Sequence, residues 1–179
     1  ITSPLKKNTK IGFHIDTHGD GIKDVAFNVD NAKIAWETSI DRGAKSAMEP
    51  TKISDRNGEA IISAIHTFGD TIHTFIQRNN FNGVFLPGYM PIESNSNSKS
   101  SGLVHIDHIV GNQPNGEMQK TCDFYEKIFG WHRFWTVDDN DITTEYSSLR
   151  SIVMANQNEK IKIPVSYTHL RSHETSHHL

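Results

Sequence analysis

The chain has 179 residues and a formal net charge of −3, with 35% hydrophobic and 22% charged residues. These values are typical of a folded globular protein and give no reason to expect nucleic acid or an anionic membrane as a partner. No apolar run approaches the roughly 20 residues that a membrane span needs. A single cysteine, Cys122, excludes an internal disulfide and suits a reducing compartment, so a cytoplasmic location is expected.

Two changes in composition divide the chain. The stretch 93–101 is rich in serine and asparagine and has no hydrophobic period, which indicates a linker after an N-terminal domain at 1–92. From Val165 onward the sequence shows neither a helical nor a strand period. We therefore expect a second domain at 102–164 and a tail at 165–179 that does not belong to it.

Before the linker, the pattern predicts a strand, a helix and further strands. Val25, Phe27 and Val29 alternate with polar residues and predict a half-buried strand. Asp30 or Asn31 can cap the helix that follows. The apolar stripe and the terminating glycine of that helix are Ala32, Ala35, Trp36, Ser39, Ile40 and Gly43. Two strand-like runs, "EAIISAIHTF" and "DTIHTFIQR", then meet at a Gly-Asp turn.

After the linker, the same order of elements returns. "LVHIDHIV" predicts a strand, and "GNQPNGE" ends it. Met118, Cys122, Tyr125 and Phe129 lie on one side of a predicted helix that Gly130 stops. "HRFWTVD", "TEYSSLRSIVMAN" and "KIKIP" predict three more strands. A strand, a helix and several strands, occurring twice, predict an α+β fold of duplicated modules whose curved sheets pair around a pocket.

The stretch "HIDHIVGNQP" holds two histidines three residues apart. On a strand, His108 shares a face with apolar residues and points to the core, whereas His105 points away. A buried imidazole needs a partner, which is either a carbonyl or hydroxyl group or a metal ion. One histidine does not make a metal site, so both alternatives stay open on these residues alone. Aligning the two segments places Val25 opposite His108, so only the second module could carry a metal ion.

The remaining histidines and the cysteine are assigned structural roles. His14 and His18 are four residues apart, but the surrounding glycines and aspartates indicate a loop rather than a metal-binding helix. His66 and His73 are expected to face solvent or to bond locally. The histidines of the tail have no core to organise them. Cys122 lies on the apolar stripe of the second helix and is expected to be packed rather than reactive.

Several motifs together resemble the 4-hydroxyphenylpyruvate dioxygenase family. They are "HGDGIKD", "RGAK", "TFGDTIHTF", "FLPGY", "IDHIVGNQP", "FGWHRFW", "TEYSSLRSIV" and "KIKIP", which extend from His18 to Pro164 in the family's order. The resemblance implies the vicinal-oxygen-chelate, or glyoxalase-like, fold with paired βαβββ modules in each domain. It also implies that the N-terminal domain binds no metal.

The resemblance implies a site and a reaction as well. The family binds Fe(II) through two histidines and one glutamate, and the motif "IDHIVGN" assigns His108 as the first metal ligand. Ser151, in "LRSIV", corresponds to a substrate-binding position. The implied reaction converts 4-hydroxyphenylpyruvate and O2 to homogentisate and CO2 in tyrosine and phenylalanine breakdown. No nucleic acid or membrane partner is implied, and the full-length protein is expected to be a homo-oligomer.

The sequence departs from the family after Pro164, where "VSYTHLRSHETSHHL" matches nothing in it. Because the chain also begins with Ile1, we expect an incomplete chain whose second domain lacks the second histidine and the glutamate, and which is itself inactive. Two other interpretations stay open. One is a hydroxymandelate synthase, which acts on the same substrate, and the other is a non-catalytic small-molecule-binding module of the same superfamily.

Overall fold

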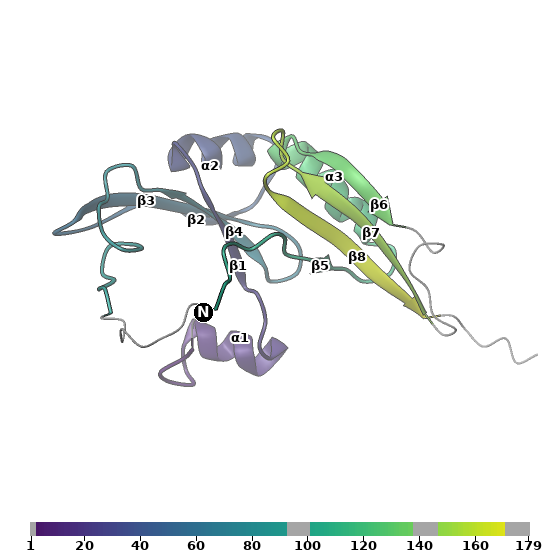
Figure 1. The fold of residues 1–179 in the computed structure, drawn as a ribbon, viewed down its shortest axis with the longest axis horizontal. Helices are drawn as coiled ribbons and strands as arrows, with labels where there is room; N and C mark the ends of the chain where they lie inside the picture. The colour runs from purple at the N-terminus through teal and green to yellow at the C-terminus, as the bar shows by residue number, and fades with distance from the viewer. Residues whose placement is uncertain (1–2, 93–100, 138–146, 171–179) are drawn as a thin grey trace, which may run out of the picture. The chain divides into compact units, whose positions relative to one another are not determined.

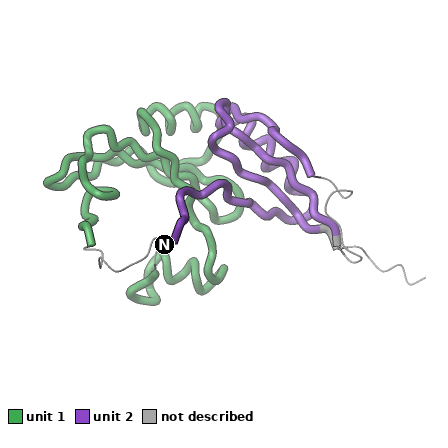
Figure 2. Tube along the Cα trace, in the orientation of Figure 1, with its two compact units in different colours: residues 1–93 green, residues 94–179 purple. Residues whose placement is uncertain are grey.

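The computed structural model describes residues 3–92, 101–137 and 147–170. The chain divides into two compact units, Ile1–Glu93 (unit 1) and Ser94–Leu179 (unit 2) (Figure 2). Each unit has a four-stranded sheet of its own. None of the helices in the described ranges is long and apolar enough to cross a membrane.

Unit 1 is built on a sheet with the strand order β1-β4-β3-β2 (Figure 1). β1 runs parallel to β4, and the other neighbouring pairs are antiparallel. The strands expected before the linker are confirmed as β1, β3 and β4, whereas the sequence pattern did not predict β2. The elements are α1 (Lys10–His18), β1 (Asp24–Asn28), α2 (Ala32–Asp41), β2 (Ser46–Asp55), β3 (Gly58–His66) and β4 (Ile72–Gln77).

Unit 2 repeats this arrangement with the strand order β5-β8-β7-β6 (Figure 1). Its first and last strands are again parallel, and its other pairs are antiparallel. The predicted α+β class with two βαβββ modules is therefore confirmed. The elements are β5 (Gly111–Asn112), α3 (Met118–Phe129), β6 (His132–Val137), β7 (Ser147–Ala155) and β8 (Lys162–Leu170).

The module helices begin and end largely where the sequence predicts. The side chain of Asn31 caps α2 by accepting a hydrogen bond from Ile34 N at 2.9 Å. Gly130 ends α3 with a left-handed φ of 67°, which glycine adopts without steric cost. Cys122 and Tyr125, on the predicted stripe of α3, are fully buried. Amphipathic patterning is thus sufficient to locate both helices.

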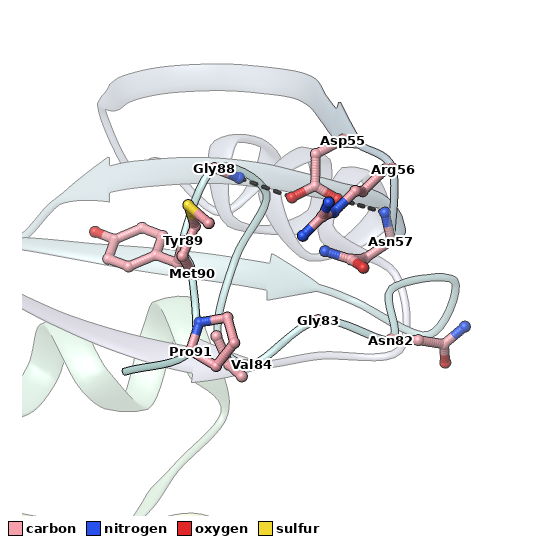
Figure 3. A pocket seen from close by; sticks show the side chains of 10 residues that line it. All are labelled: Asp55, Arg56, Asn57, Asn82, Gly83, Val84, Gly88, Tyr89, Met90 and Pro91. Atoms are coloured by element: carbon pink, nitrogen blue, oxygen red, sulfur yellow. Dashed lines mark hydrogen bonds between the residues drawn. The ribbon is translucent and has the colours of Figure 1, made fainter. Parts of the chain in front are cut away.

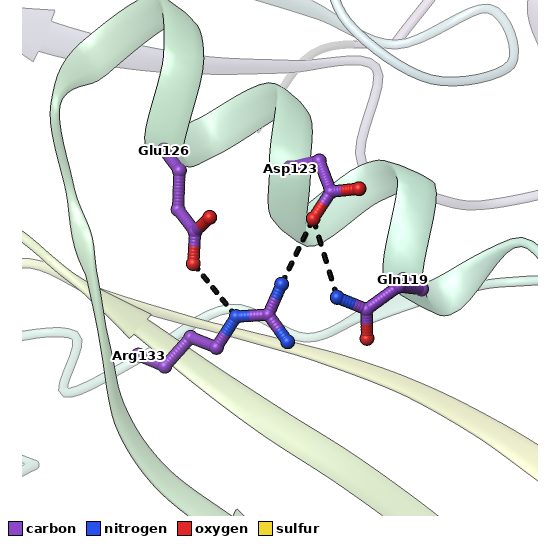
Figure 4. A network of polar contacts seen from close by, with 4 residues as sticks. All are labelled: Gln119, Asp123, Glu126 and Arg133. Atoms are coloured by element: carbon purple, nitrogen blue, oxygen red, sulfur yellow. Dashed lines mark hydrogen bonds and ion pairs between the residues drawn. The ribbon is translucent and has the colours of Figure 1, made fainter.

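Arg133 on β6 connects the sheet of unit 2 to α3 (Figure 4). Its Nε donates to Glu126 Oε1 at 2.6 Å, and its Nη2 donates to Asp123 Oδ1 at 2.8 Å. Gln119 donates a further bond to Asp123 at 3.2 Å. Arg133 therefore lies on the helix side of the sheet. The strand register places the buried side chains of Ile152, Met154, Ile163 and Val165 on that same side.

Two expectations about local structure are wrong. The stretch that holds His14 and His18 is not a loop, because Thr9 caps it by accepting a hydrogen bond from Gly12 N at 3.1 Å and the chain forms α1. The sequence after Pro164 is not unstructured throughout, because Val165–Leu170 continue β8 and pair with β7. The other histidines expected in the tail lie beyond the described residues.

His73 on β4 is a buried histidine in the core of unit 1, with an exposed fraction of 1%. Its Nδ1 lies 3.0 Å from the carbonyl oxygen of Val25, and its ring centroid lies 4.9 Å from that of Phe27. Burial lowers the pKa of His73 to about 4, and the bond to Val25 only partly opposes this effect. The expectation that His73 faces solvent or bonds locally is therefore wrong, whereas His66 is exposed.

We predict that the chain loses stability as the pH falls from 6.5 to about 4 because of His73. In this window the unfolded chain binds a proton at His73 and the folded chain does not, so protons favour unfolding. The free energy of unfolding should fall by about 3 kcal/mol at the acid end and show no contribution from His73 above pH 6.5. Urea denaturation across this range measures the change.

The variants His73→Phe and His66→Gln separate this effect from the titration of carboxylates. His73→Phe should remove the His73 part of the pH dependence, even if it lowers stability at neutral pH. His66→Gln changes an exposed histidine at the end of β3 and should keep the pH dependence of the parent. An unchanged slope in His73→Phe would contradict the assignment.

Candidate metal and substrate site

His108, the predicted metal ligand, lies on the segment that precedes β5. Residues 101–110 have no regular secondary structure, so the strand expected over "LVHIDHIV" is wrong. The side chain of His108 is 48% exposed, and His105 is exposed as well. His108 therefore does not point to the core in this structure. Its role as a metal ligand stays a prediction.

A carboxylate orients the imidazole of His108. Asp107 Oδ2 lies 2.7 Å from His108 Nδ1, and this hydrogen bond lowers the pKa of Asp107. A carboxylate at one ring nitrogen fixes the orientation of the ring and increases the basicity of the other nitrogen. The pair therefore presents His108 Nε2 as the atom that can bind a metal ion.

The β5–β8 pairing is short at the edge where His108 was expected, and Pro164 lies at this edge. Gln113 N donates to Ser166 O at 2.7 Å, so the peptide groups of Ser166 face β5. Pro164, two residues earlier, faces the same edge but has no N–H to donate. Thr74, the third residue of β4 as Pro164 is of β8, has an N–H, which bonds to the side chain of Asp24. In unit 1 the pairing with β4 extends along all of β1.

The strand register also corrects the alignment of His108 between the two modules. The last strand of each module begins directly after a hairpin, with Ile72 in unit 1 and Lys162 in unit 2. Asp24 pairs with Ile72, and counting back along the sequence from the Gly111–Val165 pair aligns His108 with Lys162. His108 therefore corresponds to Asp24, one residue before the expected Val25.

Asp24 makes polar contacts in unit 1 that the sequence pattern did not predict. Its Oδ1 accepts a hydrogen bond from Thr74 N at 3.1 Å, and its Oδ2 accepts one from Thr74 Oγ1 at 2.6 Å. Desolvation raises the pKa of Asp24, although the two bonds from Thr74 act in the opposite direction. In the alignment of the two modules, this carboxylate therefore stands opposite His108.

Ser151, the predicted substrate-binding residue, lies in the middle of β7 and is buried. Its neighbour Ile152 faces α3, so Ser151 lies on the opposite, helix-free face of the sheet. Ser166 pairs with it directly and presents a second buried hydroxyl on this face. The apolar side chains around this pair on β6 and β7 are Trp135, Val137 and Val153.

His108 and Ser151 do not bond to each other in the part of the chain that the structure describes. Within the same ranges, no three histidine, cysteine, aspartate or glutamate side chains are arranged to hold a metal ion. Cys122 is fully buried, and burial raises the pKa of its thiol to about 11. Cys122 is therefore packed and protonated at neutral pH, as the helical stripe predicts.

Two further features were not predicted from the sequence. The side-chain nitrogen Nε2 of Gln113 is buried and has no hydrogen-bond partner within the described residues. A surface pocket of about 600 Å³ lies in unit 1, between the β2–β3 turn and the loop at 82–91 (Figure 3). Asp55 holds this loop by accepting a hydrogen bond from Gly88 N at 2.9 Å. The pocket contains neither His108 nor Ser151.

Comparison with solved structures supports the fold. A triple mutant of 4-hydroxymandelate synthase from Streptomyces coelicolor superimposes with a TM-score of 0.70 at 20% identity, over 92% of this chain and 46% of that chain. A fusion protein of a xylose isomerase-like TIM barrel and a 4-hydroxyphenylpyruvate dioxygenase gives a TM-score of 0.58 at 12% identity, over 87% of this chain and 22% of that chain. At these identities the likeness concerns the fold alone.

Comparison of sequences gives closer relatives. The profile of the Glyoxalase/Bleomycin resistance protein/Dioxygenase superfamily matches residues 105–179. The 4-hydroxyphenylpyruvate dioxygenase of Tetrahymena thermophila is 47% identical over 86% of this chain, and that of Dictyostelium discoideum is 42% identical over 93%. The chain spans only 39% and 47% of these two proteins. Residues 105–179 thus match the model of this superfamily, and the chain is similar in sequence to 4-hydroxyphenylpyruvate dioxygenases.

Proposed function

We propose that this chain is part of an Fe(II)-dependent dioxygenase that converts 4-hydroxyphenylpyruvate and O2 to homogentisate and CO2. The observation that carries the proposal is the 47% identity to a 4-hydroxyphenylpyruvate dioxygenase over 86% of the chain. The reaction belongs to tyrosine and phenylalanine breakdown. We place the complete protein in the cytoplasm as a homo-oligomer.

In this proposal His108 is the first protein ligand of Fe(II). Imidazole is a suitable ligand for this ion, and Asp107 holds the ring so that His108 Nε2 faces away from the carboxylate. The described residues therefore fit one ligand position of the iron site. When bound, Fe(II) would supply the oxygen chemistry.

Ser151 and its surroundings would bind the organic substrate. The helix-free face of the unit 2 sheet offers two buried hydroxyls, from Ser151 and Ser166, among apolar side chains. Hydroxyl groups can bond to the polar ends of a 2-oxo acid, while the apolar side chains pack against an aromatic ring and exclude water. The opposite face is occupied by α3, so we assign the substrate to the helix-free face.

We predict that His108→Ala abolishes turnover in a protein that carries this segment within a complete catalytic domain. The variant should lose homogentisate formation by at least about two orders of magnitude while its circular dichroism stays unchanged, because an exposed side chain is removed. His105→Ala, an exposed neighbour, is the matched control and should retain activity. Product analysis also separates homogentisate from hydroxymandelate. Full activity in His108→Ala would favour a non-catalytic role for this segment.

In the same protein, Ser151→Ala should raise KM for 4-hydroxyphenylpyruvate by about tenfold, which corresponds to one lost hydrogen bond. Ser148→Ala is the matched control, because Ser148 is also buried on β7 but lies on the α3 side of the sheet. Steady-state kinetics measure both variants. Equal changes in KM for the two variants would indicate a general effect on packing rather than contact with substrate.

The 179-residue chain by itself should form no homogentisate and bind Fe(II) weakly. The motifs assign one protein ligand, His108, of the three that the resemblance implies. Anaerobic equilibrium dialysis with Fe(II), followed by an oxygen-consumption assay with 4-hydroxyphenylpyruvate, checks both statements. Tight, stoichiometric Fe(II) binding together with product formation would contradict them.

A further inference from the structure

The helix α1 of unit 1 brings two histidines together on one face. His14 and His18 are separated by one helical turn, and their ring centroids lie 4.8 Å apart. The cap at Thr9 begins the helix around them, and Gly19, whose N–H bonds to Ile15 O, ends it. The sequence-based expectation of a loop would have separated the rings, whereas the helix places them side by side.

A carboxylate from another part of unit 1 contacts this pair. Asp70 lies in the turn between β3 and β4, and its Oδ2 is 2.8 Å from His18 Nε2. Lys23 donates a hydrogen bond to the backbone oxygen of Asp70 and so helps to hold the turn in place. The side chain of His18 is 42% exposed, which leaves it accessible to an ion from solvent.

We propose that His14 and His18 form a two-imidazole site for a divalent transition-metal ion such as Zn²⁺, with Asp70 as a positioning residue. Asp70 bonds to Nε2 of His18, so the nitrogen of His18 that faces the metal is Nδ1. A carboxylate on the outer nitrogen of a metal-binding histidine fixes its tautomer and raises its basicity. The site needs two protein ligands, and water molecules complete the coordination shell.

The chemistry of the pair selects the class of ion. Neutral imidazole suits zinc, copper and nickel, whereas magnesium and calcium prefer shells of oxygen ligands. Asp70 is engaged by His18 and does not supply the oxygen shell that a hard cation needs. The alternative is a purely structural role, in which the His18–Asp70 bond attaches α1 to the β3–β4 turn and no metal ion binds. His14 has no part in that role, so substitution of His14 distinguishes the metal site from the structural contact.

Calorimetric titration with ZnCl₂ tests the proposal. The histidines of the tail could bind zinc themselves, so the parent is the full chain with His169, His173, His177 and His178 each replaced by Gln. Compared with this parent, His14→Gln and His18→Gln should each lose one zinc equivalent per chain. Gln is a good helix former, and circular dichroism checks that α1 is retained.

Two further variants sharpen the test. Asp70→Asn should keep the stoichiometry but weaken zinc binding by about tenfold, as expected for a residue that positions a ligand. His66→Gln removes an exposed histidine of the same unit and should leave both stoichiometry and affinity unchanged. The proposal is overturned if His14→Gln titrates like the parent. It is also overturned if His66→Gln loses as much zinc as His14→Gln does.

Discussion

The parallel pairing between the first and last strands of each module determines whether the segment that carries Asp24 or His108 is held in the sheet. In unit 1 this pairing runs along the whole of β1, and in unit 2 it includes only Gly111 and Asn112. In unit 2, Pro164 offers no N–H at the edge of β8 that faces β5. The segment that carries His108 has no regular secondary structure, and the ring of His108 bonds to Asp107.

In each unit, one face of the sheet packs against the module helix and contributes to the core. In unit 2, Arg133 bonds to two carboxylates of α3 and marks the helix side, where Met154 and Val165 are fully buried. In unit 1, Ser63 Oγ donates to the carbonyl of Ala32 at 2.9 Å and marks the same side. Ser151 lies on the other face and is also buried, so protein atoms outside α3 cover it.

The sequence predicted the regular elements with strong hydrophobic periods and failed where other interactions decide the structure. The alternation around Phe27 and the stripe through Tyr125 located β1 and α3 because burial alone determines these elements. β2 was missed because it is a bulged edge strand with mostly exposed residues and a proline, Pro50, so it has no clear alternation. The orientation of His108 was also missed, because the segment that carries it does not form the strand that its apolar alternation predicts.

Asp24 and His108, which the alignment of the two modules pairs, have different hydrogen-bond partners. The carboxylate of Asp24 is held by two donors from Thr74, its N–H and its hydroxyl. Pro164, at the position of Thr74, has neither donor, so a carboxylate in the place of His108 would lose both bonds. An imidazole there requires only one acceptor for its Nδ1–H, and Asp107 provides it from the adjacent residue. In the proposed metal site, the bond from Nδ1 to Asp107 would leave Nε2 of His108 to bind the ion.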